Sequence, residues 1–430
     1  MTADPRKIGI GVVAGVLAAF AGLLVEMDLT MAVVLALLVF GRIAFADDAR
    51  VRLAMLAGLL LWVLVLPLFH DPAGGFIDTA VLALAYSVMG LGLNIIVGFA
   101  GLLDLGYVAF FALGALAAGW FMSNFFSGTN GGDGLHVLVS GVAAELPGLH
   151  FNFLFVVVVA VIVCTIAGML IGLPTLRLRG DYIAIVTLAF GEIIGRVVIN
   201  GDDLPFGLPQ VTKGRQGITP IDKIDLPLLA PFEALNLRPW FWAALVLLLA
   251  VLFVNYRLRD SRLGRAWIAL REDEVAASSM GVPVVRTKLL AYGTGAAFGG
   301  IAGAFLASLL NTVNADQFQF YFSVFVLSMV ILGGLGSIEG VLLGGIVLTY
   351  INFRLIPGLS DLPASIGLDF DTTQLNYGIF GFLLVIMMVM RPEGLIPERR
   401  RRLELREGIG VGVTTGVGGP GDEKVVEARG

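Results

Sequence analysis

The hydrophobic pattern of the chain consists of long apolar runs separated by short polar segments. Runs of about 17–25 apolar residues cross a hydrocarbon core about 30 Å thick when they form helices. The runs are Ile8–Val25, Leu29–Ala46, Leu53–Phe69, Thr79–Val97, Tyr107–Phe126, Phe151–Leu173, Tyr182–Asn200, Trp240–Tyr256, Lys288–Leu310, Tyr321–Leu335, Val341–Phe353 and Tyr377–Met390. The pattern predicts an all-α polytopic membrane protein with about 10–12 transmembrane helices. Tyr321–Leu335 and Val341–Phe353 are short, which predicts either a hairpin that does not cross or one broken helix.

One polar segment, Arg257–Arg286, interrupts this pattern in the second half of the chain. Within it Leu263, Ala266, Trp267 and Leu270 recur at helical spacing, which predicts a short amphipathic helix. A segment of this kind between two membrane spans presents a surface on which another protein docks.

The ends of the helices in this segment carry the usual capping residues. Asp260 or Ser261 is placed to accept a bond from a free backbone N–H at the start of the first helix. A second short helix is predicted over Asp273–Met280, ending at Gly281, with Pro283 just beyond it.

The composition agrees with a membrane protein and excludes several other classes. With 57% hydrophobic and 14% charged residues, the chain is too apolar for an ordinary soluble protein. The single cysteine, Cys164, excludes a disulfide within the chain, and with three histidines it makes a metal cluster implausible. A net charge of −5 gives no indication of nucleic-acid binding.

The basic residues predict the orientation in the membrane, because cytoplasmic loops are enriched in Lys and Arg. If the runs alternate, five basic clusters fall on one side: Arg6/Lys7, Arg42/Arg50/Arg52, Arg177/Arg179, the arginines of Arg257–Arg271, and Arg399–Arg402. Both termini and the polar segment are therefore predicted to be cytoplasmic. Residues beyond Glu407 are Gly-rich without apolar periodicity, which predicts a disordered tail.

Two Gly-rich stretches, Gly98–Val108 and Gly333–Gly340, each follow one apolar run and open another. If they are a true internal repeat, they predict two halves that meet around a pathway. Asp104 lies where helical pairing is expected to break, and broken helices expose backbone dipoles to polar solutes or to other segments. The alternative is a loop carboxylate that faces the cytoplasm.

The run Tyr182–Asn200 contains two charged residues. Glu192 and Arg196 are four residues apart, so a helix places them on one face, where they are able to pair. A charge in a bilayer is costly unless it is paired or hydrated. The two interpretations are an ion pair that closes a helix–helix contact and side chains that line a polar pathway.

The sequence contains no nucleophile–base pair, metal-ligand cluster or GxxxxGK[ST] phosphate loop. We therefore expect no enzymatic activity and no cofactor bound by this chain. If transport is active, the nucleotide chemistry belongs to another subunit.

Many membrane helices, no nucleotide-binding motif and one structured polar segment together resemble the permease subunit of an ATP-binding-cassette importer. Such permeases carry a cytoplasmic Glu-Ala-Ala-x-x-x-Gly motif on a helix that docks into the ATPase. Ala276, Ala277 and Gly281 match that spacing, whereas Val275 stands in the Glu position and Glu274 lies one residue earlier.

Longer blocks resemble the larger type of branched-chain amino acid importer permease. They are NIIVGFAGLLDLGYVAFFALGA, LRLRGDYIAIVTLAFGEI, REDEVAASSMGV and VLSMVILGGLGSIEGVLLG. The resemblance implies an N-terminal transmembrane extension at 1–75, a permease core at 76–395 with a coupling loop at 257–286, and a basic then disordered cytoplasmic tail at 396–430.

The resemblance also implies a bacterial inner-membrane assembly with a second, smaller permease, two ATPase subunits that use ATP and Mg, and a periplasmic binding protein. The residues it indicates for coupling are Arg265, Glu274, Ala276, Ala277 and Gly281. Glu274 is expected either to pair with an ATPase arginine or to solvate the turn after Leu270. Leu, Ile and Val are zwitterions with apolar side chains, so their pathway needs modest polarity. Asn94, Tyr107, Thr187 and Glu192 are the predicted pathway residues.

Three other functions stay open at this point. A permease for urea or short amides in the same family would share fold and partners, and the binding protein would distinguish it. A proton- or sodium-driven transporter would act as a single chain, without ATPase subunits. A channel or assembly scaffold would show no dependence on ATP.

Overall fold

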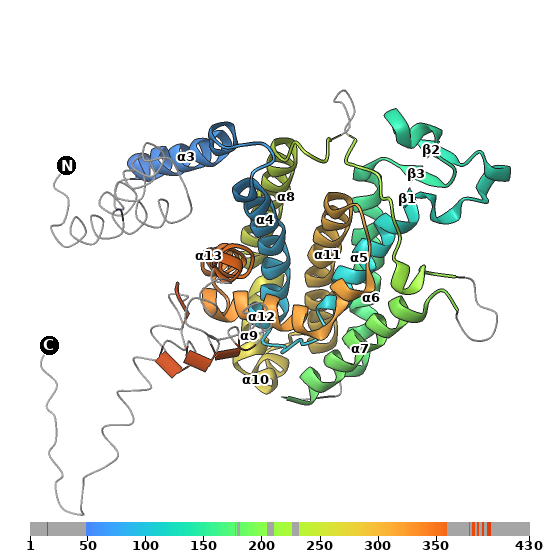
Figure 1. The fold of residues 1–430 in the computed structure, drawn as a ribbon. Helices are drawn as coiled ribbons and strands as arrows, with labels where there is room; N and C mark the ends of the chain where they lie inside the picture. The colour runs from blue at the N-terminus through green and yellow to red at the C-terminus, as the bar shows by residue number, and fades with distance from the viewer. Residues whose placement is uncertain are drawn as a thin grey trace, which may run out of the picture.

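The computed structural model describes most of the chain between residues 49 and 358. The described residues are 49–176, 178, 181–203, 210–225 and 232–358, with isolated positions at 15, 378, 381–382, 385–386, 389–390 and 394–396. This part is a bundle of helices with a small three-stranded sheet at one end (Figure 1). The predicted all-α membrane architecture is confirmed, and the sheet is a small addition to it.

The helices follow the apolar runs of the sequence. Their bounds are α3 Ala49–Val65, α4 Gly75–Leu93, α5 Val108–Phe121, α6 Phe153–Thr175, α7 Asp181–Asn200, α8 Arg238–Arg259, α9 Arg262–Glu272, α10 Glu274–Ser279, α11 Val284–Leu310, α12 Phe320–Gly333, α13 Ile338–Tyr350 and α14 Ile356–Gly358. Among the described residues, six helical segments are long and apolar enough to cross a membrane, and three shorter apolar helices accompany them. The chain is therefore a multi-pass membrane protein.

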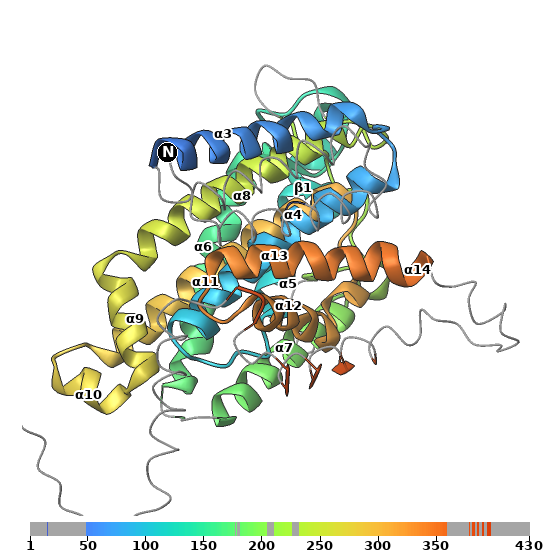
Figure 2. The same cartoon turned by 90° about the vertical axis from the view of Figure 1, so that its left-hand side faces the viewer.

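Helix α11 occupies the middle of the bundle, with α4, α5 and α6 packed around it (Figures 1 and 2). Small residues allow this close packing: a Cβ added to Gly114 of α5 would lie 2.2 Å from the carbonyl oxygen of Gly300 in α11. Without a hydrophobic driving force between membrane helices, such close backbone approach supplies the packing energy.

The two shorter runs near the end of the described region form two separate helices, α12 and α13, which pack against each other. The second continues through a π-helical segment, η9 (Ile351–Leu355), so that Ile338–Leu355 reaches 18 residues and is long enough to span. A single broken helix is therefore excluded. The predicted spans Ile8–Val25 and Leu29–Ala46 and the tail lie outside the described residues, as does most of Tyr377–Met390.

A cap covers the end of the bundle opposite α9 and α10 (Figure 1). Its strands are β1 (Met122–Ser123), β2 (Leu135–Val137) and β3 (Leu149–Phe151), in the order β1-β3-β2. Strand β1 runs antiparallel to β3, and β2 runs parallel to it. The buried ring of His150 contacts Asp222 at 2.6 Å, which ties the sheet to the segment that precedes α8.

Lys223, in the same segment of the cap, lies over the indole of Trp240 with its Nζ 5.4 Å from the ring centroid. The ammonium donates to the carbonyl oxygens of Ser308 and Leu309 at the end of α11, each at 3.4 Å. Cations are stabilising at the C-terminus of a helix. Burial lowers the pKa of Lys223.

Candidate functional site

Helix α9 begins at Ser261 and is anchored on α11 by a tryptophan. The Ser261 hydroxyl accepts a hydrogen bond from the backbone N–H of Gly264 at 3.2 Å, so Ser261, rather than Asp260, is the N-cap. The fully buried Trp267 donates its indole N–H to the carbonyl oxygen of Thr287 at 2.9 Å. Helix α9 is therefore fixed to the first turn of α11.

Helix α10 is short and capped at both ends. One carboxylate oxygen of Asp273 accepts from the backbone N–H groups of Val275 at 2.8 Å and Ala276 at 3.0 Å. The helix ends at Ser279, and Gly281 just beyond it has a φ of +84°, the left-handed conformation that favours glycine. A Cβ at Gly281 would meet no atom within 4 Å, so the glycine serves the backbone conformation rather than close packing.

The predicted coupling residues have different roles in the structure. Ala277 is buried, whereas Ala276 and Arg265 are exposed, and the Arg265 guanidinium donates to the carbonyl oxygen of Asp260 at 2.8 Å. Glu274 is neither free nor simply solvated, because both its carboxylate oxygens accept from the ammonium of Lys288 at 2.9 Å. Sequence reasoning missed Lys288, since a partner fourteen residues away on another helix has no local signal.

Several apolar side chains of α10 and of the residues that follow it are open to solvent. Val275 is 63% exposed, Met280 is 86% exposed, and Val285 in the first turn of α11 is 55% exposed. We call Val275, Ala276, Met280 and Val285 the coupling surface. Four arginines of the same polar segment are exposed as well: Arg257, Arg262, Arg265 and Arg286. Exposed apolar side chains rimmed by charge are typical of a protein-docking site.

Next to the coupling helices α9 and α10, the regular helical structure is interrupted between α4 and α5. Helix α4 ends in a π-helical segment, η2 (Asn94–Phe99), and the chain then runs without regular structure to α5. Arg271 of α9 donates to the carbonyl oxygen of Gly98 in η2. A cavity of about 200 Å³ lies beside this contact and is lined by Gly101, Arg271 and Lys288 among others. The coupling helices thus contact the broken helix directly.

The two Gly-rich stretches meet at this break. The side-chain oxygen of Asn94 accepts from the backbone N–H of Gly336 at 2.9 Å, a contact between residues 242 apart in the sequence. Broken backbone at membrane depth is tolerated where neighbouring groups satisfy it. The two stretches are therefore neighbours in space, while the internal repeat and the pathway between two halves stay predictions.

Two other predicted pathway residues also hold the backbone of the break. The Thr187 hydroxyl oxygen accepts from the N–H of Leu105 at 3.0 Å, and the Tyr107 hydroxyl donates to the carbonyl oxygen of Gly295 at 2.9 Å. Asn94, Tyr107 and Thr187 are all buried. Their contacts show that these three side chains position the chain break.

Asp104 does not face the cytoplasm as a loop carboxylate. Its side chain is 1% exposed, and one oxygen accepts from the backbone N–H of Gly106 at 2.8 Å. The hydroxyl oxygen of Ser323, in α12, accepts from the N–H of Val108 at 3.0 Å. Ser323 was missed because a serine in an apolar run carries no distinctive sequence signal.

The comparisons with known proteins agree with this arrangement. The profile of the family described as "Branched-chain amino acid transport system / permease component" matches residues 75–388. The chain belongs to this permease family. No solved structure is significantly similar to the chain.

Relatives of two kinds match this permease. It is 36% identical over 351 residues, 79% of this chain and 74% of the relative, to the high-affinity branched-chain amino acid transport system permease protein LivM of Escherichia coli. A probable LivM of Methanocaldococcus jannaschii is 27% identical over 329 residues, 73% of this chain and 91% of the relative. LivH of Escherichia coli is 30% identical over 152 residues, 35% of this chain and 45% of the relative.

The fourth predicted pathway residue, Glu192, lies elsewhere in the permease. Glu192 and Arg196 are both exposed on the outer side of α7. Within the described residues neither takes part in an ion pair, so the predicted pair that closes a helix–helix contact is wrong for the single chain. Their position on α7 leaves them available to a group outside this bundle.

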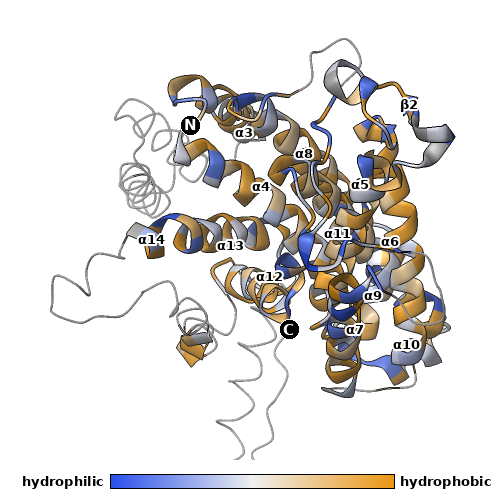
Figure 3. Cartoon of the chain, turned by 45° about the vertical axis from the view of Figure 1, so that its right-hand side comes forward, coloured by the Kyte–Doolittle hydropathy of each residue, from blue (hydrophilic) through white to orange (hydrophobic). Residues whose placement is uncertain are grey.

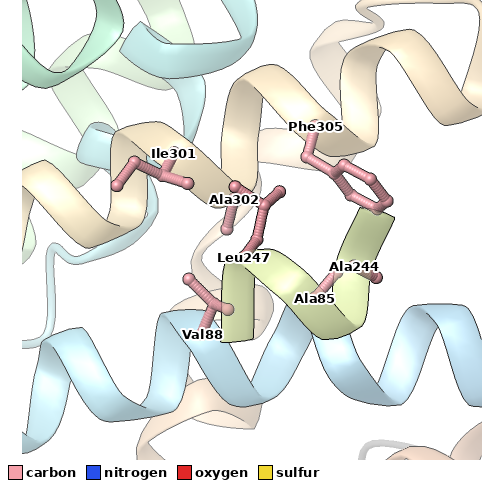
Figure 4. Close-up of a pocket in the computed structure, with 7 residues that line it drawn as sticks. All are labelled: Ala85, Val88, Ala244, Leu247, Ile301, Ala302 and Phe305. Carbon is pink, nitrogen blue, oxygen red and sulfur yellow. The ribbon is translucent and has the colours of Figure 1, made fainter. Parts of the chain in front are cut away.

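A small cavity lies among α4, α8 and α11 (Figure 4). Its volume is about 10 Å³, and its lining includes Val88, Leu247 and Phe305. A space of that size holds at most one water-sized sphere.

Proposed function

We propose that this chain is the larger permease subunit of an ATP-driven importer of branched-chain amino acids. In this proposal an ATPase subunit docks on the coupling surface. The observation that carries the proposal is a group of exposed apolar side chains on α10 and just after it, Val275 and Met280 above all, joined to rigid contacts that lead into the membrane helices. The substrate class comes from the names of the LivM relatives.

Three contacts transmit a movement of the docked helices. Glu274 ties α10 to Lys288 of α11, Trp267 ties α9 to Thr287 of α11, and Arg271 ties α9 to η2. Because α11 lies in the centre of the bundle, a push on α10 reaches α4, α5 and α6 together. ATP-driven closure of the partner subunits then alternates the access of the membrane pathway.

The proposed partners follow from the same relatives. A smaller permease of the LivH type pairs with this chain, and its partial match to this sequence supports a pair of related permeases. Two ATPase subunits bind ATP and Mg, and a periplasmic binding protein delivers the substrate. The exposed arginines of the polar segment favour the cytoplasmic side for α9 and α10 of an inner-membrane protein, with cytoplasmic termini.

A single substitution on the coupling surface tests this function. Met280→Asp places a charge where Met280 is 86% exposed, so the fold is expected to persist while the ATPase loses its docking site. The assay is co-purification of the ATPase subunits and ATP-dependent leucine uptake in vesicles. The matched control is Leu235→Asp, because Leu235 is 78% exposed and lies in the segment before α8.

We expect Met280→Asp to abolish both ATPase recovery and leucine uptake, and Leu235→Asp to keep the ATPase bound. Normal ATPase recovery with Met280→Asp would contradict the docking site. ATP-dependent uptake of urea in place of leucine, isoleucine and valine would contradict the substrate class while leaving the docking site intact.

A further inference from the structure

Helix α7 has one face that nothing in the described part of the chain covers. Tyr182 is 69% exposed, Ile185 is 60% exposed and Ile193 is 53% exposed, and Glu192 and Arg196 are exposed beside them. At 3.6 residues per turn, positions 182, 185, 192, 193 and 196 fall on one side of the helix. We call Tyr182, Ile185, Glu192, Ile193 and Arg196 the open face of α7.

The charges of the open face lie well inside the membrane span. The candidate span is Tyr182–Asn200, so Glu192 is close to its middle, and Arg196 follows about 6 Å further along the axis. A charged side chain at the centre of a bilayer costs about 2.5–3.5 kcal/mol on insertion scales. The open face is therefore unsuited to lipid.

Helix α6 shows what a lipid-facing surface of this protein looks like. Apart from Pro174, its exposed residues are all large and apolar: Leu154, Phe155, Val158, Ile162, Ile166, Leu170 and Leu173. Hydrophobic positions run along the whole of α6, whereas α7 is mixed (Figure 3). Both helices are largely exposed on this chain, yet only α7 carries opposite charges on its exposed side.

The chemistry of the open face matches a free amino acid with an apolar side chain. Such a molecule carries an ammonium and a carboxylate beside a hydrocarbon group. The carboxylate of Glu192 is complementary to the ammonium, and the guanidinium of Arg196 is complementary to the carboxylate. Ile185 and Ile193 supply the neighbouring apolar contact.

The inner side of α7 joins this face to the coupling helices. Thr187 accepts from the backbone of Leu105, and a Cβ at Gly106 would lie only 1.9 Å from the carbonyl oxygen of Thr187. The segment that contains these residues follows η2, which Arg271 contacts. A movement of α9 therefore reaches α7 through packed backbone.

We propose that the open face of α7 is one wall of the substrate path, closed by the second permease, and that Glu192 and Arg196 bind the two charged ends of the zwitterionic substrate. This inference rests on the proposed import of amino acids. The partial match of this chain to LivH supports a second, related permease as the chain that closes this wall.

Thiol labelling of the complete importer in vesicles tests the proposal. The sole cysteine, Cys164, is buried, so Cys164→Ala provides a background for single cysteines. Ile193→Cys and Ile185→Cys report on the open face, and Ile162→Cys and Val158→Cys on α6 are the matched apolar controls. The reagent is a charged, water-soluble methanethiosulfonate, applied without ATP and with the binding protein present.

We expect both α7 cysteines to react and both α6 cysteines to stay unmodified, because lipid excludes the reagent. L-Leucine is added at about ten times its dissociation constant for the proposed site on α7. Because it then occupies most of these sites, labelling of Ile193→Cys should be about tenfold slower. The compounds 4-methylpentanoate and 3-methylbutylamine, which each lack one charged group, should not protect. Adding Glu192→Gln or Arg196→Gln should remove the protection by leucine and leave labelling itself unchanged.

Two results would overturn the inference. If the α7 cysteines did not react, the open face of α7 would be covered by lipid or otherwise closed to water. Protection by leucine that persists in both Gln variants would show that the charges do not bind the zwitterion. Leucine uptake by the unsubstituted importer is measured in parallel. Failed uptake contradicts the proposed function, whereas normal uptake with reactive but unprotected α7 cysteines contradicts this inference alone.

Discussion

The ammonium of Lys288 in α11 lies 2.9 Å from each carboxylate oxygen of Glu274 in α10. Lys288 is only 4% exposed, so Glu274 is the counter-ion of a buried charge. Removing the counter-ion of a buried charge is more damaging than replacing both partners, because an uncompensated charge is left behind. The pair therefore links the stability of α10 to the packing of the central helix.

Substituting Glu274→Gln is expected to lower the free energy of unfolding by about 2 kcal/mol, since Lys288 keeps its charge without a counter-ion. The double substitution with Lys288→Met should recover most of the loss. Thermal unfolding in detergent measures both, as a double-mutant cycle. If the double substitution lowered the stability as much as Glu274→Gln alone, the ion pair would make no measurable contribution to stability.

Position 281 distinguishes backbone conformation from side-chain size. Gly281→Val puts a β-branched residue at a φ of +84°, which costs about 1–2 kcal/mol and shifts the end of α10. Gly281→Asn is the control, because asparagine tolerates the left-handed conformation. We expect Val to reduce leucine transported per ATP hydrolysed and Asn to keep it. Full coupling in the Val variant would refute this.

The contact between the two Gly-rich stretches depends on one side chain. Asn94→Ala leaves the N–H of Gly336 without its acceptor, which is expected to cost about 1–3 kcal/mol of stability. Asn200→Ala is the matched control, because the Asn200 amide is exposed and bonds only to Arg196 in its own helix. Differential scanning fluorimetry compares the two. Similar melting temperatures for both variants would contradict the structural role of Asn94.

Trp267 holds α9 on α11 through its buried ring and through one hydrogen bond. Two substitutions separate these contributions to stability. Trp267→Phe keeps a buried ring but loses the bond to Thr287, and about 1 kcal/mol is expected to be lost. Trp267→Ala removes the ring as well, for a loss of about 3–5 kcal/mol. The measurement is proteolysis within 257–286 together with thermal unfolding. A Phe variant as unstable as Ala would place the whole contribution in the hydrogen bond.

The lengths of the hydrophobic runs and the capping residues predicted the positions of many helices, and some of their ends, from the sequence alone. The apolar runs located every long helix of the described region, because a bilayer imposes a minimum span on each. Ser261 and Gly281 marked the ends of α9 and α10 through local backbone chemistry, which acts within a few residues and is readable in sequence. The family resemblance, carried by short blocks of residues, is confirmed by the profile match.

Only the tertiary structure decided which polar residues face inward. Asn94, Tyr107 and Thr187 were predicted for a pathway, yet they bond to backbone groups of Gly336, Gly295 and Leu105, each brought near by packing. Helical periodicity placed Glu192 and Arg196 on one face of α7, but which face is open depends on where α5, α6 and α12 lie. Contacts between residues far apart in the chain depend on the packing of whole helices, and no local pattern encodes them.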